Sequence, residues 1–474
     1  MGSEDSRTRV VVIGGGPGGY PAAFHAADLG LDVVLIDTDA NPGGVCLYRG
    51  CIPSKALLHV AGIVEEAQHA ADFGIAFEKP HIDLDKLNKW KKSVIDKLTG
   101  GLGQLARQRK VRFLQGRASF AGSRDINVDM GDGKQEQLGF DYAIIATGSR
   151  PTSIAVFPQS PAVMDSTGAL TLETIPDSLL VVGGGYIGLE LGQAYAALGS
   201  RVSVVEMLPL LLATVDADLR KGLERRINNQ FESVMLKTRV TQVEETDGGI
   251  RVTMEPESGE SRTETYERLL VSVGRQANTE NLGLENTGVQ VGDDGFIRVD
   301  EQRRTDDPAI FAIGDVAGQP MLAHKATREG HVAAEAIAGM KTVFDNRAIP
   351  AVVFTHPEIA WCGMTEIEAK EQGVKVEVSR FPWAASGRAT TLGTSDGVTK
   401  LIVEPETERI LGMGVSGPGA GELIAEGVLA IEMGAVVSDL GLAIHPHPTL
   451  SETVMEAAEV FHNHSPHFAP RKKR

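Results

Sequence analysis

Short, uninterrupted apolar runs dominate the hydrophobic pattern of this chain. Residues 10–13 and 179–182 form two such runs, and each leads directly into a glycine-rich turn. Continuous apolar runs are typical of strands buried on both faces of a parallel sheet. Similar runs predict further strands at 142–146, 269–273, 309–313, 351–354, 400–403 and 410–415. Helical spacing is seen at 75–110, 420–434 and 449–461. We therefore expect an α/β fold, with a separate α+β domain over about the last 125 residues.

Two glycine-rich turns repeat at a fixed distance along the chain. Their glycines are Gly14, Gly16 and Gly19 in the first copy and Gly183, Gly185 and Gly188 in the second. The offset of 169 residues also maps Asp37, at the end of one apolar run, onto Glu206 at the end of another. Between a strand and a helix, G-x-G-x-x-G followed by such an acid is typical of Rossmann-like dinucleotide binding. The helix N-terminus faces the pyrophosphate, and the acid accepts a ribose hydroxyl. The sequence therefore predicts two dinucleotide sites.

Composition and charge narrow the range of functions. The chain of 474 residues has a formal net charge of −17, which argues against a nucleic-acid binder. We expect no membrane segment, because no run approaches the roughly 18–20 apolar residues of a span. The N-terminal residues lack the apolar core of a secretion signal, and the C-terminal PRKKR is predicted to be a solvated tail. Three cysteines are too few to staple a chain of this size, so we expect a cytoplasmic protein.

Two of the three cysteines, Cys46 and Cys51, lie close together soon after the first glycine-rich turn. A metal site, two inert thiols and a redox-active disulfide are the alternatives, and we favour the disulfide; no metal site is expected. In a regular helix five residues would separate the cysteines by about 7.5 Å along the axis. A disulfide needs Cα atoms within about 6.8 Å. We therefore expect a distortion, for which Gly50 is well placed. A helix continuing from Pro53 would put Cys51 near its N-terminus, where the thiolate is stabilised.

The segment GGVCLYRGCIPSK closely resembles the redox centre of the pyridine nucleotide–disulfide oxidoreductases. The resemblance continues through nearly the whole chain, in the motifs ATG (146–148), GGGYIGLE (183–190), VGR (273–275), AIGD (312–315), MLAHKA (321–326) and HPHPTLSE (445–452). It implies two Rossmann-like domains and a C-terminal α+β dimerisation domain. The implied boundaries are 1–150 for the first part of the FAD-binding domain, 151–275 for the NAD-binding domain, 276–348 for a central domain completing the FAD site, and 349–474 for the interface domain.

The resemblance also implies roles for individual residues. Cys46 would be the interchange thiol and Cys51 the thiol beside the flavin, with Lys55 and its partner Glu190 next to the flavin ring. Cys362 is expected to be a buried bystander. Further FAD contacts would come from Gly14, Gly16, Gly19, Asp37, Gly116, Thr147, Gly148, Asp315 and Ala323. NAD contacts would come from Gly183, Gly185, Gly188, Glu206, Val240 and Gly274. An acid at Glu206 with no arginine close behind it favours NAD over NADP.

The C-terminal His447 and Glu452 match the acid–base pair of the same family, while His445 matches a neighbouring position without the main catalytic role. From spacing alone, Thr449-x-x-Glu452 is also typical of a capping box, so Glu452 could instead be a helix cap. The resemblance implies an FAD-dependent homodimer that oxidises protein-bound dihydrolipoyl groups with NAD. Its partner would be the lipoyl carrier of a 2-oxo acid dehydrogenase or glycine-cleavage complex. A glutathione reductase-like enzyme and a catalytically silent flavoprotein scaffold are the alternatives.

Overall fold

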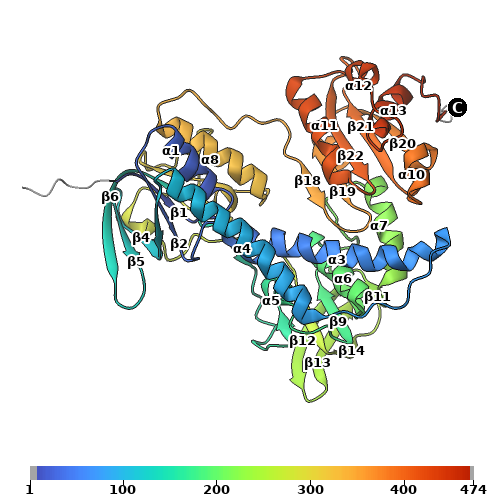
Figure 1. Cartoon of the computed structure of the whole chain (residues 1–474), viewed down its shortest axis with the longest axis horizontal. Coiled ribbons are helices and arrows are strands. Elements are labelled where there is room, and N and C mark those ends of the chain that lie inside the picture. Colours follow the sequence, from blue (N-terminus) through green and yellow to red (C-terminus); the bar gives the residue numbers. More distant parts are fainter. Residues whose placement is uncertain (1–7, 470–474) are drawn as a thin grey trace, which may run out of the picture.

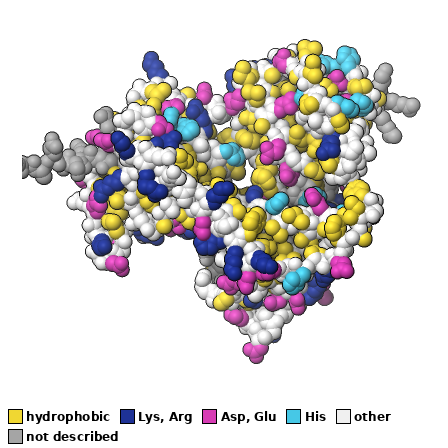
Figure 2. All heavy atoms as spheres, viewed as in Figure 1, with side chains coloured by type: hydrophobic (Ala, Val, Ile, Leu, Met, Phe, Trp, Pro, Cys, Tyr) yellow, Lys and Arg dark blue, Asp and Glu magenta, His cyan; other side chains and the backbone are white. Residues whose placement is uncertain are grey.

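The computed structural model describes residues 8–469, so the basic run at 470–474 lies outside the described residues. The chain forms three lobes (Figure 1). The first and last parts of residues 8–348 together make the first lobe, and the middle part makes the second. The remaining residues form the third lobe, and the molecular surface is indented where the lobes meet (Figure 2). No helix of the described residues is both long and apolar enough to cross a lipid bilayer.

The first lobe is built on a parallel sheet of strand order β3-β2-β1-β6-β17, with bounds Arg112–Gln115, Val33–Asp37, Thr8–Ile13, Gln135–Ile145 and Ile310–Ala312. Helices α1 (Gly19–Asp28) and α8 (Ala323–Ile337) pack together over one face. An antiparallel meander of β4 (Arg117–Gly122), β5 (Asp125–Asp129) and the first half of β6 closes the other. The expected buried run 10–13 is confirmed, because its residues are at most 4% exposed.

The second lobe repeats this architecture. Its parallel sheet has the order β11-β10-β9-β15-β8, with bounds Ser233–Met235, Arg201–Val205, Ser178–Val182, Arg268–Val271 and Val163–Met164. One face is covered by α5 (Ser166–Thr171), α6 (Tyr186–Leu198) and α7 (Ala217–Gln230). The other face carries the meander β12 (Thr238–Thr246), β13 (Gly249–Pro256) and β14 (Arg262–Tyr266). The sequence repeat is therefore a repeat of whole α/β units.

A two-stranded ribbon of β7 (Ser149–Pro151) and β16 (Arg275–Ala277) connects the first two lobes. Helix α3 (Cys51–His69) starts beside the first sheet and packs along α6 of the second lobe. Helix α4 (Leu84–Gln108) returns to the first lobe, where its last turns pack beside β3. The expected helix over 75–110 begins later than predicted, at Leu84. Pro80 disfavours helix at the residue before it, and Asp83 caps α4 by accepting a hydrogen bond from the Lys86 N–H.

The third lobe is an α+β domain, as predicted. Its antiparallel sheet has the order β18-β19-β22-β21-β20, with bounds Ala351–Val353, Ile359–Gly363, Ile410–Ser416, Val398–Val403 and Glu377–Pro382. Helix α11 (Ala420–Met433) packs on β19 and β22, and α13 (Glu452–Phe461) packs on β20, β21 and α12 (Val437–Leu442). The short helices α9 (Glu366–Gln372) and α10 (Gly387–Thr391) complete this lobe. The expected helix at 449–461 starts three residues later than predicted.

Candidate functional site

The first glycine-rich turn closes tightly between β1 and α1. Gly14 has a φ of +103°, and a Cβ on it would lie 2.2 Å from the Ala146 carbonyl oxygen. A Cβ on Gly19 would lie 1.7 Å from the Gly14 carbonyl oxygen, so neither position accepts a side chain. The Gly15 N–H donates to the Asp37 carboxylate, and the Asp39 N–H donates to its other oxygen at 2.8 Å. Burial raises the pKa of Asp37 above its usual value, although both N–H donors oppose that effect.

The second turn reproduces this geometry 169 residues later. Gly183 has a φ of +106°, and a Cβ on Gly188 would lie 2.3 Å from the Gly183 carbonyl oxygen. The Glu206 carboxylate accepts hydrogen bonds from the Gly184 N–H at 2.6 Å and from the Leu208 N–H at 2.7 Å. The two acids are therefore held by equivalent backbone donors in the two lobes. This equivalence extends the sequence repeat to the level of individual hydrogen bonds.

A cavity of about 580 Å³ opens between the first two lobes, within the size range of cofactor pockets. It is lined by all but one of the residues expected to contact FAD: Gly14, Gly16, Asp37, Lys55, Gly116, Thr147, Gly148, Asp315 and Ala323. Gly19 lies behind this wall, where it allows α1 to approach β1. The N-terminus of α1 at the cavity offers unpaired N–H groups to an anionic pyrophosphate. The residues present therefore fit a flavin dinucleotide.

The residues expected to contact NAD lie together in the second lobe. Gly183, Gly185 and Gly188 surround the N-terminus of α6, and Gly274 has a φ of +115° just after β15. Val240 on β12 is partly buried against the same core as Val205, which precedes Glu206. Tyr186 and Ile187, at the start of α6, line the same cavity between the first two lobes. The second nucleotide site therefore adjoins the first.

The cysteine segment packs directly on the first glycine-rich turn. The Gly43 N–H donates to the Gly15 carbonyl at 2.7 Å, and a Cβ on Gly44 would lie 2.5 Å from Gly16 Cα. Helix α2 (Gly44–Arg49) stops at Gly50, whose φ of −141° and ψ of −111° are not helical, and α3 begins at Cys51. The distortion expected at Gly50 is therefore present. It places both thiols at the cavity wall.

Cys46 and Cys51 are free thiols in this structure, with Cys46 half-buried and Cys51 exposed toward the cavity. The pKa of Cys51 is lowered to about 7, chiefly by a hydrogen bond from Cys46 and also by the nearby Lys55 ammonium, while burial opposes both effects. The same hydrogen bond and burial raise the pKa of Cys46. Cys51 is therefore the thiol that carries negative charge in the reduced pair. Cys362 is 1% exposed on β19, where burial raises its pKa to about 12.

Lys55 and Glu190 form the ion pair that the sequence resemblance implied. The Lys55 ammonium lies 2.7 Å from the Glu190 carboxylate and 4.4 Å from the centre of the Phe354 ring. Glu190 also accepts hydrogen bonds from the Phe354 N–H at 2.9 Å and the Ser54 hydroxyl at 3.3 Å. Sequence reasoning missed Phe354, because this residue from the third lobe belongs to none of the recognised motifs.

Glu329 is a second residue that sequence reasoning missed. Its fully buried carboxylate accepts a hydrogen bond from the Gly314 N–H at 2.6 Å and lies 3.0 Å from both Arg303 and Lys325. Gly314 opens the short turn that brings Asp315 to the cavity. Glu329 therefore holds a cofactor-facing loop from behind. Lys325 is four residues away on α8, a spacing the sequence does show, but Arg303 and Gly314 lie on other elements, so spacing alone does not indicate this role.

His447 and Glu452 form the second half of the candidate chemistry. The His447 Nδ1 atom lies 2.9 Å from Glu452, whose other oxygen accepts the Thr449 N–H at 2.8 Å. The capping-box alternative is half right: Glu452 makes its backbone bond, but the Thr449 hydroxyl donates to the Pro446 carbonyl and the helix begins at Glu452. His445 is bound separately by Glu426 at 2.8 Å. All residues lining the cavity come from positions 13–326, so the His447–Glu452 pair lies outside it.

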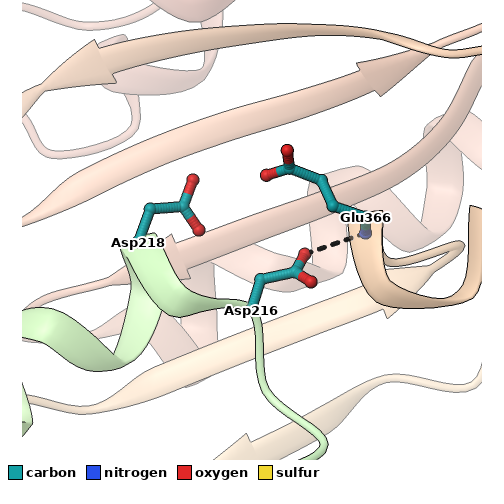
Figure 3. A group of neighbouring side chains, drawn as sticks. All are labelled: Asp216, Asp218 and Glu366. Carbon is teal, nitrogen blue, oxygen red and sulfur yellow. Dashed lines mark hydrogen bonds between the residues drawn. The ribbon is translucent and has the colours of Figure 1, made fainter. Parts of the chain in front are cut away.

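The carboxylates of Asp216, Asp218 and Glu366 lie close together where α7 meets the third lobe (Figure 3). Such a cluster could hold a metal ion, but the buried Lys400 ammonium reaches all three, at 2.6, 2.8 and 2.8 Å respectively. Arg380 adds further contacts to Asp218 and Glu366. Asp216 also accepts the first N–H groups of α9, from Glu366 at 3.0 Å and Ile367 at 3.1 Å. The cluster therefore ties the second lobe to the third with the protein's own cations.

Comparisons with known proteins agree with this geometry. Residues 8–330 match the pyridine nucleotide-disulphide oxidoreductase family, and residues 349–458 match its dimerisation domain. Dihydrolipoyl dehydrogenase of Vibrio cholerae is 50% identical over 97% of this chain and 96% of its own length. The enzyme of the same name from Thermus scotoductus is 48% identical over 98% and 99%.

Solved structures give the same result. LpdA from Mycobacterium tuberculosis has a TM-score of 0.89 at 28% identity, covering 95% of this chain and 99% of that chain. The HOCl-induced flavoprotein disulfide reductase RclA from Escherichia coli has a TM-score of 0.84, also at 28% identity, covering 95% and 99%. Sequence and structure therefore place this chain in the pyridine nucleotide–disulphide oxidoreductase family.

Proposed function

We propose that this protein is an NAD-dependent dihydrolipoyl dehydrogenase containing FAD, in which Cys46 and Cys51 are the redox-active pair. The observation that carries this proposal is the placement of Cys51. It lies at the start of α3, faces the cavity that fits FAD, and has a thiol pKa lowered to about 7. Its neighbour Lys55 is held by Glu190. A dithiol that ionises near neutral pH beside a flavin pocket is suited to exchange electrons with a second dithiol.

The reaction begins with Cys46 and Cys51 joined as a disulfide. One substrate thiolate attacks the Cys46 sulfur, forms a mixed disulfide, and releases Cys51 as a thiolate. The second substrate thiolate then attacks its partner sulfur, which closes the lipoyl disulfide and releases Cys46. The substrate is oxidised by two electrons, and the cysteine pair is reduced by two. The residues lining the cavity would hold FAD, which would supply a two-electron acceptor for the reduced cysteine pair and a hydride donor for NAD.

His447 is proposed to be the base that removes the thiol protons of the substrate. Glu452 binds its Nδ1 at 2.9 Å, so that Nε2 is left to face the substrate. The pair lies outside the cavity of its own chain, since His447 just precedes α13 and Glu452 begins it. Helix α13 lies on the side of the third lobe that faces away from the first lobe (Figure 1). We therefore propose that a homodimer brings His447 of one copy to Cys46 of the other.

The exposed apolar residues of the third lobe support this arrangement. Leu429, Met433, Leu442 and Ile444 are between 64% and 99% exposed, as expected for a surface that another copy covers. The match of residues 349–458 to a dimerisation domain agrees with this. We further propose that the enzyme acts in the cytoplasm. Its substrate would be the lipoyl carrier of a 2-oxo acid dehydrogenase or glycine-cleavage complex.

The experiment that tests the proposed function is a steady-state assay of the holoenzyme with dihydrolipoamide or glutathione as donor and NAD or NADP as acceptor. We expect NADH formation from dihydrolipoamide, and a loss of more than about 1,000-fold with Cys51→Ser, because the disulfide cannot form. Cys362→Ser is the matched control and should remain active. Undiminished turnover by Cys51→Ser, or activity with glutathione and NADP alone, would overturn the proposal.

A further inference from the structure

Three glutamates share one face of α13, the helix that begins at the proposed acid–base pair. Glu452, Glu456 and Glu459 are spaced four and three residues apart, so they lie next to one another along the helix. Glu452 is bound to His447. Glu456 is 3% exposed, although an isolated buried carboxylate is costly. The negative charge of Glu456 therefore needs partners. Because Glu456 lies about one helical turn from Glu452, those partners also lie near Glu452.

The segment that follows α13 supplies those partners by folding back along the helix. Its first turn is fixed where the His464 N–H donates to the Glu459 carbonyl at 2.8 Å. Further on, the Ser465 hydroxyl donates to Glu456 at 2.6 Å, and His467 Nδ1 hydrogen-bonds to the other Glu456 oxygen. The Phe468 ring then packs edge-on against Phe381 of β20, with centroids 6.4 Å apart. Figure 2 shows histidine side chains gathered at this end of the third lobe.

This folding-back gives His467 an electrostatic influence on Glu452. The hydrogen bond to Glu456 raises the pKa of His467, and the charges of Glu456, Glu452 and Glu459 add to this. Burial would raise the pKa of Glu452, but the Thr449 N–H, His447 and His467 together lower it. The contact with Glu456 thus favours the protonated form of His467, one helical turn from the carboxylate that orients the proposed base. Glu456 balances that cation, so the pair together adds almost no net charge.

The other elements packed on α13 bring few charges to this point. Strands β20 and β21 contact the helix through hydroxyl groups. The Ser379 hydroxyl donates a hydrogen bond to the Ala457 carbonyl, and the Thr399 hydroxyl shares one with the Thr453 hydroxyl. At the far end of the helix, His462 contacts Ser438 of α12 and lies 3.8 Å from Glu408. Within residues 8–469, the charged groups that act on His467 are therefore the three glutamates of α13, with His464 acting on Glu459 beside it.

We propose that His467, held by Glu456, is a positioning residue that sets the electrostatic environment of the His447–Glu452 pair. It contacts neither substrate nor cofactor in this arrangement and acts through Glu452. Removing its positive charge would leave Glu456 unbalanced one helical turn from Glu452. The added negative potential would hold the proton on the acid–base pair more strongly. The inference rests on the proposed role of His447.

The test is the pH dependence of kcat/KM for dihydrolipoamide oxidation by the holoenzyme at low ionic strength. His467→Gln should move the acidic limb of the profile to higher pH by about 0.3–0.7 unit, as expected for one unscreened charge at this range. The double variant Glu456→Gln/His467→Gln removes both charges and should return the limb to within about 0.2 unit of the native position. His464→Gln, on the same segment but beside Glu459, is the control and should move the limb less than His467→Gln.

Two further observations separate this role from a merely structural one. The shift in His467→Gln should shrink at about 0.5 M salt, because screening weakens the interaction, and thermal melting should confirm that each variant is folded. An unmoved limb in folded His467→Gln, or an equal shift in the double variant, would overturn the inference. His447→Gln tests the proposed base separately: if it remains fully active, the proposed function of the pair fails, whatever His467 does.

Discussion

Lys55 lies 2.7 Å from the Glu190 carboxylate and 4.4 Å from the Phe354 ring centre, so its ammonium joins all three lobes beside the redox cysteines. Lys55 and Glu190 have opposite effects on the pKa of Cys51. Lys55 lowers the pKa of the Cys51 thiol and Glu190 raises it, both after the larger effect of the hydrogen bond from Cys46. Glu190 therefore holds the cation in place while tempering its effect on the thiol.

Lys55→Met should raise the pKa of Cys51 by about one unit, because the thiolate loses its nearest cation. Glu190→Gln keeps the Lys55 ammonium but removes the opposing negative charge, so the pKa of Cys51 should fall below its native value. The measurement is the pH dependence of iodoacetamide alkylation in the reduced enzyme with Cys46→Ser, so that Cys51 alone reacts at the cavity. Lys92→Met, on the exposed surface of α4, is the control. Equal alkylation profiles in Lys55→Met and Lys92→Met would contradict this account.

Gly19→Ala and Gly188→Ala should separate the two nucleotide sites. Each Cβ would collide with a backbone carbonyl, at 1.7 Å from Gly14 and 2.3 Å from Gly183, so each variant must distort one turn. We expect Gly19→Ala to be purified with little flavin. Gly188→Ala should keep its flavin and show a KM for NAD raised by about 10-fold or more, the effect of losing about 1.4 kcal/mol of binding. Flavin absorbance and steady-state kinetics measure the two effects.

Gly62→Ala provides the matched control for those two variants. Gly62 lies inside α3, and a Cβ there would meet no atom within 4 Å. Replacing a helical glycine by alanine stabilises by roughly 0.5–1 kcal/mol. Normal flavin content in Gly19→Ala, alongside normal behaviour of Gly62→Ala, would contradict the close-packing argument.

Glu206→Ala should narrow the preference for NAD over NADP. The Glu206 carboxylate is fixed by two backbone N–H groups at the end of β10, where it suits a ribose hydroxyl and repels a 2′-phosphate. We expect the ratio of kcat/KM for NAD to that for NADP to fall by about 10-fold, since one charge repulsion of roughly 1.4 kcal/mol is removed. An unchanged ratio would mean that another residue determines the preference.

Lys400→Met should destabilise the fold. The ammonium is 1% exposed among Asp216, Asp218 and Glu366, and a buried ion cluster that loses one partner costs about 3 kcal/mol or more. Urea unfolding of the holoenzyme measures the change. Lys92→Met, which breaks the exposed pair with Asp96, should cost less than about 0.5 kcal/mol. Equal costs in the two variants would contradict this interpretation.

The same cluster predicts a dependence of stability on pH. Burial would raise the pKa of Asp218, but Lys400 and Arg380 outweigh it and the pKa is lowered. A carboxyl whose folded pKa lies below its unfolded value stabilises the fold above the unfolded pKa of about 3.9. That stabilisation is lost as the pH falls through the folded pKa. The acid-induced loss should therefore be smaller in Lys400→Met than in the native protein.

Many features of this protein could be predicted because they depend on residues close together in sequence. A glycine-rich turn and the acid ending the next strand belong to one strand–helix–strand unit, so their spacing alone places Asp37 against Gly15 and Glu206 against Gly184. The break at Gly50 follows from the reach of a disulfide and the rise of a helix. The α/β fold was predictable for the same reason. The start of α4 was predicted too early, because the expected range 75–110 ran through Pro80, whereas the helix begins at Leu84.

Only the tertiary structure decided which distant residues meet. Glu190 and Phe354 are 164 positions apart, and Asp216 and Lys400 are 184 apart. No periodicity links such pairs, because each is set by the packing of separate lobes. The place of His447 outside the cavity of its own chain and the return of His467 to Glu456 belong to the same class. The sequence by itself determined the nucleotide turns and the thiol pair, whose contacts are local. The charges surrounding them depend on long-range packing, which sequence spacing does not encode.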